Sequence, residues 1–115
     1  MRAVILACDK IRDKIRVGCL KCFKALSEKS GKFAEVDDLE IVAWTSCGGC
    51  PGFPIARLKL IDEMLKAEGK SFDVVFLASC MLMAEKNFCK MDLNEVEKKI
   101  REEFGVEVIR GTHPQ

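Results

Sequence analysis

The sequence lacks the uninterrupted apolar run of roughly 20 residues that a membrane-spanning helix needs. Its apolar start, residues 3–8, is too short for a secretory signal peptide and leads directly into charged residues. It also lacks a basic run, because 19 Lys and Arg are interspersed with 18 Asp and Glu, for a formal net charge of +1. We therefore expect a cytoplasmic protein whose partners include neither a membrane nor nucleic acid.

Two further absences concern chemistry. No Gly-rich loop carries the Lys that a phosphate-binding loop requires, so a nucleotide-binding module is the least favoured function. No Asp or Glu is clearly placed as a general base, which disfavours metal-dependent hydrolysis. The sequence leaves open whether the protein is an enzyme, what its substrate would be and which oligomeric state it adopts.

Cysteine, by contrast, is abundant. The chain has 115 residues, 49% of them hydrophobic, which suffices for one domain with its own core and without disulfides. Seven cysteines are an odd number and a high one for this length. In a reducing compartment they are better suited to metal ligation or thiol chemistry than to disulfide bonds.

The pattern of apolar residues predicts alternating strands and helices. Apolar and β-branched segments predict four strands, at residues 2–7, 39–45, 72–78 and 106–110. Helical periodicity separates them, at residues 19–29, 55–68 and 92–104, while segments 9–17 and 81–91 fit either a helix or a loop. Short right-handed crossovers then give an α/β fold, a three-layer sandwich with a four-stranded parallel sheet. We favour the flavodoxin-like strand order 2-1-3-4.

The predicted helices have defined apolar faces. In segment 55–68, Leu58, Ile61 and Leu65 are expected to point inward. Leu60 and Met64 are expected to widen this stripe. Asp92 is expected to begin the last helix, with Glu95 completing a capping box, a sequence typical of helix amino ends.

A thiol or an imidazole follows every predicted strand. The first strand is followed by Cys8, the second by Cys47 and Cys50, the third by Cys80 and the fourth by His113. Parallel strands end at one edge of a sheet and lie about 4.8 Å apart, so these side chains are predicted to converge. Chance would also have placed cysteines at the amino ends of the strands, which strengthens the prediction.

The Cys-x-x-Cys turn has features that suit thiolate chemistry. Two intervening residues allow the sulfurs of Cys47 and Cys50 to bind one ion. Gly48 and Gly49 permit a positive φ and are expected to direct amide N–H groups toward the sulfurs. Pro54 opens the next helix, whose amino end favours the thiolate form. The alternative is a buried structural pair beside a tight turn.

Several of these residues together resemble the CGGC-domain family over nearly the whole chain, as one domain of residues 1–115. The resemblance is carried by the hexapeptide Cys47–Gly52, Cys8, Ser79-Cys80, Cys89 and Gly111-Thr112-His113. It implies metal binding, with zinc as the metal, and no defined reaction. It also implies that Cys19 matches a cysteine of the family pattern, although a further cysteine expected before Cys19 is absent here. Core packing competes evenly for Cys19 and Cys22, which share an apolar helix face.

The first hypothesis is a metal-binding protein in which Cys47 and Cys50 are primary ligands of Zn²⁺, or of an iron–sulfur cluster as a variant. The other ligands would come from Cys8, Cys19, Cys80, Cys89 and His113.

The alternative is a thiol–disulfide oxidoreductase or redox sensor with a redox protein partner, in which Cys47 attacks and Cys50 resolves the disulfide. Two features argue against this alternative. Trp44 lies three residues before Cys47, a spacing that differs from that of thioredoxin-like sites, and the five further cysteines would have no role.

Overall fold

The computed structural model describes residues 1–11, 20–48 and 52–112 of the chain. At its centre is a four-stranded sheet in the order β2-β1-β3-β4, in which every neighbouring pair is parallel. Its strands are β1 (Arg2–Ala7), β2 (Glu40–Ser46), β3 (Val74–Leu77) and β4 (Glu107–Arg110). The predicted strand order and parallel direction are confirmed.

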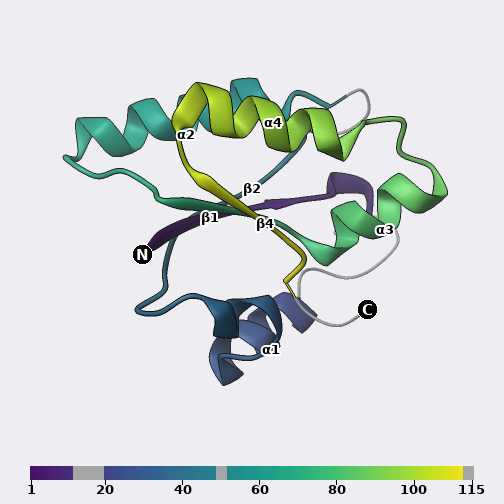
Figure 1. Ribbon diagram of the computed structural model, residues 1–115, viewed down its shortest axis with the longest axis horizontal. Helices are drawn as coiled ribbons and strands as arrows, with labels where there is room; N and C mark the ends of the chain where they lie inside the picture. The colour runs from purple at the N-terminus through teal and green to yellow at the C-terminus, as the bar shows by residue number, and fades with distance from the viewer. Residues whose placement is uncertain (12–19, 49–51, 113–115) are drawn as a thin grey trace.

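Helices cover both faces of this sheet (Figure 1). Their bounds are α1 (Leu20–Glu28), the 3₁₀ helix η2 (Gly31–Glu35), α2 (Pro54–Ala67), α3 (Ser79–Asn87) and α4 (Leu93–Phe104). In Figure 1, α2 and α4 lie above the sheet and α1 lies below it, which confirms the three-layer sandwich. The segment that fitted either helix or loop, 81–91, is helical as far as Asn87.

β1 is the centre of the core, and its side chains alternate between the two faces. Val4 and Leu6 pack into the cluster that includes Leu58 of α2 and Ile100 of α4. Ile5 and the small residues of β1 pack into a second cluster, on the face of the sheet that α1 and η2 cover. Residues on both faces are fully buried, as expected for a central parallel strand covered by two helical layers.

The ends of α4 follow its sequence signals. The Asp92 side chain accepts a hydrogen bond from the amide of Asn94 (2.9 Å), which confirms Asp92 as the amino-terminal cap. The amide of Leu93 donates to the Glu85 carboxylate of α3 (2.8 Å), a tertiary cap that the sequence did not indicate. At the other end Gly105 adopts a left-handed conformation with φ of 65°.

Two predicted core positions are wrong. Leu60 and Met64 of α2 are 61% and 70% exposed, whereas Leu58 is fully buried. The reason is geometric: a residue two positions along a helix lies roughly 200° around its axis, so Leu60 turns away from the face that Leu58 presents. The apolar stripe therefore runs through Leu58 and Leu65 without widening.

No helix among the residues that the structure describes is long and apolar enough to cross a membrane.

The packing of α2 gives a matched pair of substitutions. Leu58→Ala should lower the free energy of unfolding by about 3 kcal/mol, because it removes a fully buried side chain from the larger cluster. Leu60→Ala, two residues further along the same helix, should change it by less than about 0.5 kcal/mol. Urea denaturation of both variants measures this, and equal losses would contradict the assigned face of α2.

Candidate functional site

The register of the sheet brings Cys8 and Cys47 side by side. Ala7 of β1 pairs with Ser46 of β2, and each cysteine comes immediately after one of these residues. The amide of Cys47 donates to the carbonyl of Ala7 (3.3 Å), so the pairing extends one step beyond the strands. Both cysteines are buried. The predicted convergence of these two thiols follows directly from strand pairing.

Cys80, which follows the third strand, β3, lies at the same edge of the sheet. The amide of Ala78 donates to the carbonyl of Leu6 (2.9 Å), which continues the pairing of β1 with β3. Cys80 lies in the first turn of α3, and its Sγ accepts a hydrogen bond from the amide of Cys8 (3.2 Å). Its sulfur is therefore in contact with the backbone at the end of β1.

A cavity of about 570 Å³ opens at this edge and gathers three thiols from three separate segments. Its volume is in the range of small-molecule sites. The segment after α3 contributes Cys89, whose amide donates to the carbonyl of Ala84 (2.7 Å). Among the described residues, the lining is Cys8, Cys47, Gly52, Met81, Ala84, Phe88, Cys89, Lys90 and Met91.

The turn after β2 has a more specific geometry than the sequence indicated. Gly48 has the predicted positive φ, +88°. Its amide, however, donates to the Ser46 hydroxyl (3.1 Å) and not toward a sulfur, so the prediction is wrong for Gly48, while Gly49 lies outside the described residues. A hydroxyl two residues earlier competes successfully for the same N–H group.

Sequence reasoning missed Arg57, which lies against this turn. Its Nε donates to the Thr45 hydroxyl (3.3 Å). A Cβ placed on Gly48 would be 3.0 Å from the Nη1 atom of Arg57. A guanidinium group is thus held beside the cysteine turn. The only indication of it in the sequence is that Arg57 is a cation in the first turn of the helix that follows Cys47.

The clustering of thiols is electrostatically unfavourable. Burial raises the pKa of Cys8, and hydrogen bonds from the Ile11 and Lys10 amides lower it in part. Negative charge on Cys47 and Cys89 raises the Cys8 pKa further. Several thiolates in this cavity therefore oppose one another unless a cation lies among them.

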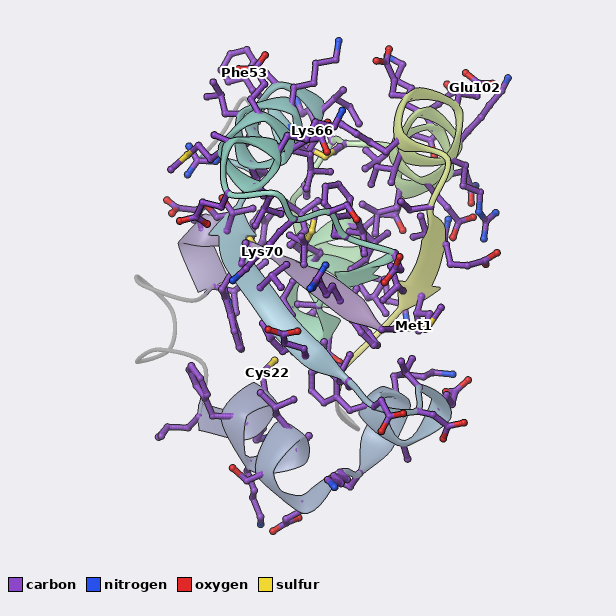
Figure 2. All side chains as sticks on the ribbon, turned by 90° about the vertical axis from the view of Figure 1, so that its left-hand side faces the viewer. Met1, Cys22, Phe53, Lys66, Lys70 and Glu102 are labelled. Atoms are coloured by element: carbon purple, nitrogen blue, oxygen red, sulfur yellow. The ribbon has the colours of Figure 1, made fainter. Side chains whose placement is uncertain are left out.

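Cys22 belongs to a different environment, below the sheet. It points from α1 toward the sheet (Figure 2), and its Sγ lies 3.0 Å from the Thr112 hydroxyl. The Thr112 amide donates to the Ser79 hydroxyl (3.1 Å), and the Ser79 amide donates to the Thr112 hydroxyl (3.3 Å). This buried polar network, also missed from the sequence, anchors the end of β4 to α1 and α3.

Three predicted ligands, Cys19, Cys50 and His113, lie outside the described residues. Within the described residues, no group of three or more His, Cys, Asp or Glu side chains is arranged so that it could hold a metal ion. The donor chemistry around the cavity still suits a thiophilic metal, because Cys8, Cys47 and Cys89 provide three soft sulfur atoms.

The fold and the site together define a class: an α/β protein with a cysteine-lined cavity at the carboxyl edge of a parallel sheet. Comparison with known proteins identifies the family. The chain matches the CGGC domain over residues 2–113, and it belongs to that family.

A relative has also been found among known proteins. The chain is 40% identical over 119 residues to an uncharacterized protein of Methanocaldococcus jannaschii, with 98% of this chain and 87% of the relative covered. No solved structure matches the chain.

The network around Cys22 predicts a pH dependence. Burial raises the pKa of Cys22, and the hydrogen bond with Thr112 offsets this only in part. Above about pH 8.5 the unfolded chain loses the Cys22 proton while the folded chain retains it, so stability falls as pH rises. Urea unfolding of reduced, metal-free protein should show a steeper loss from about pH 8 to about pH 10 than the Cys22→Ala variant shows. Parallel curves would contradict the raised pKa.

Proposed function

We propose that this protein binds a metal ion through cysteine thiolates at the carboxyl edge of its sheet, with zinc as the metal. The observation that carries the proposal is that Cys8, Cys47 and Cys89, which are far apart in the sequence, line one cavity. Cys50 would complete the set, because its spacing from Cys47 is the usual one for two sulfurs on one ion.

The remaining sulfur and nitrogen donors have weaker support as ligands. Cys80 is not among the described residues that line the cavity, and its sulfur, which accepts a hydrogen bond from the Cys8 amide, would fix the backbone at Cys8. Cys19 and His113 are further donors that the family resemblance and the strand-end position suggest.

A bound cation would resolve the electrostatic conflict in the cavity. Burial and neighbouring negative charge both oppose ionisation of Cys8, and a divalent ion stabilises thiolates strongly enough to reverse this preference. When bound, zinc would supply a Lewis-acidic positive charge without redox chemistry. The chain's own part would be to hold buried thiols around that charge and to exclude water with apolar walls.

The lining favours a closed site over a hydrolytic one. Among the described residues of the cavity wall there is neither a carboxylate nor an imidazole that could act as a general base. A set of four thiolates would leave no open position on zinc, as in structural or storage sites. We therefore propose metal holding, and not catalysis, as the role of the site.

An iron–sulfur cluster is the second candidate. Two observations favour it: the cavity, at about 570 Å³, is much larger than one ion, and no three described ligands are arranged around a single ion. A cluster of several irons accepts thiolates that stand further apart than those around one ion, and cysteine is its usual ligand.

The thiol–disulfide alternative has less support. Every strand pairing of the sheet is parallel, whereas a thioredoxin fold includes antiparallel strands. Cys47, the proposed nucleophile, is only 6% exposed, and reactive cysteines are usually partly accessible.

Elemental analysis and absorption spectra of anaerobically purified protein test the proposal. We expect stoichiometric zinc without visible absorption. Cys47→Ala and Cys89→Ala should each weaken zinc binding by about tenfold or more, since each removes a ligand. Cys22→Ala, a buried cysteine on the other side of the sheet, is the matched control and should bind zinc like the wild type.

The outcomes separate the candidates. A brown protein that contains iron and sulfide would support the cluster in place of zinc. A metal-free protein whose Cys47 and Cys50 cycle between thiol and disulfide would support redox function. Equal loss of zinc in all three variants, with each shown to be folded by circular dichroism, would contradict the proposed ligand set.

A further inference from the structure

The cavity wall contains sulfur of two kinds. Besides the three thiols, the thioether side chains of Met81 and Met91 line it. In the described part of the lining, the other polar side chain is Lys90, a cation that cannot bind a metal while protonated. The metal-binding side chains in the described lining are therefore soft sulfur donors, and none of them is a hard oxygen donor.

Met91 lies between two of the thiols. A Cβ placed on Gly52 would be 2.7 Å from the Cε atom of Met91 and 3.2 Å from the Sγ of Cys47. The methyl end of Met91 and the sulfur of Cys47 thus both lie against Gly52, whose missing side chain lets them approach. On the other side, the amide of Met91 donates to the Sγ of Cys89 (3.4 Å).

Met91 and Met81 differ in their surroundings. Met81 is 4% exposed and is a member of the larger core cluster, which is the ordinary role of a gap-filling methionine. Met91 is only partly buried and packs at the margin of that cluster. Of the two methionines, Met91 is the one whose methyl end lies beside Cys47 at Gly52 and whose backbone contacts Cys89, so a short side-chain adjustment suffices to bring its thioether to these thiols.

Thioether sulfur discriminates between metals. Soft thiolate and thioether ligands together select Cu(I), whereas zinc in proteins is bound by thiolate, imidazole and carboxylate. A thioether is also uncharged, so it adds a ligand to a crowded set of thiolates without adding negative charge.

We propose that this cavity binds Cu(I), with the Met91 thioether as a ligand beside the thiolates of Cys47 and Cys89. The inference rests on the proposed function, because its thiolate ligands are the same. It adds Cu(I) as a second metal and Met91 as a ligand that zinc would not use. No electron transfer is involved, because the ion is bound as Cu(I).

The test compares two metals on one variant. Reduced protein is titrated anaerobically with Cu(I) in competition with bathocuproine disulfonate, and separately with Zn²⁺ in competition with a chromophoric zinc chelator. Met91→Leu keeps the side-chain volume and should weaken Cu(I) binding by about tenfold while zinc affinity stays within about twofold. Met64→Leu, on the exposed face of α2, is the control and should change neither affinity.

The result identifies which proposal fails. An unchanged Cu(I) affinity in Met91→Leu overturns the thioether ligand. Equal weakening of both metals also overturns it, because that pattern shows that Met91 acts by packing. Zinc binding by the wild type without Cu(I) binding refutes this inference alone, whereas binding of neither metal refutes the proposed function as well. Urea midpoints of both variants verify that they are folded.

Discussion

The structure depends on β1 being hydrogen-bonded on both sides to strands that run in its own direction. Residues Ala3–Ala7 of β1 are fully buried between two cores, with Val4 and Leu6 facing one of them and the small Ala3 and Ala7 facing the other. A slip by one residue would exchange side chains of different size between these two close-packed cores. The fixed register places Ala7 beside Ser46 and Leu6 beside Leu77. The cysteines that follow these strands are brought together by the core, before any metal or disulfide contributes.

The sequence predicted this framework because its signals are strong and local. Apolar runs with short connections determine a parallel sheet, and a cysteine directly after a strand must lie at its carboxyl edge. The position of Cys89 could not be derived in this way, because it lies within segment 81–91, which fitted both a helix and a loop. The contact of Met91 with Gly52, and the hydrogen bond of Cys22 with Thr112, join residues far apart in the sequence and depend on tertiary packing. The exposed Leu60 is a different case, because helical periodicity itself places it roughly 200° from the buried Leu58 and therefore excludes it from the apolar stripe.

The site brings groups together at an electrostatic cost. Burial and the neighbouring Cys47 and Cys89 raise the pKa of Cys8, and hydrogen bonds from the Ile11 and Lys10 amides compensate only in part. The Arg57 guanidinium lies beside the turn that follows β2 and donates a hydrogen bond to the Thr45 hydroxyl, so a positive charge is already held near the cysteines. A metal among the thiolates would complete this compensation, and the soft lining indicates which metals suit it.

The position of a bound soft metal tests the central claim most directly. Crystals of reduced protein soaked in Cd²⁺, an anomalous scatterer that substitutes for zinc at thiolates, would locate the site without assumptions about ligands. The account predicts one principal anomalous peak inside the cavity bounded by Cys8, Cys47 and Cys89. A principal peak beside Cys22 and Thr112 below the sheet, or no peak with the thiols shown to be reduced, would contradict it.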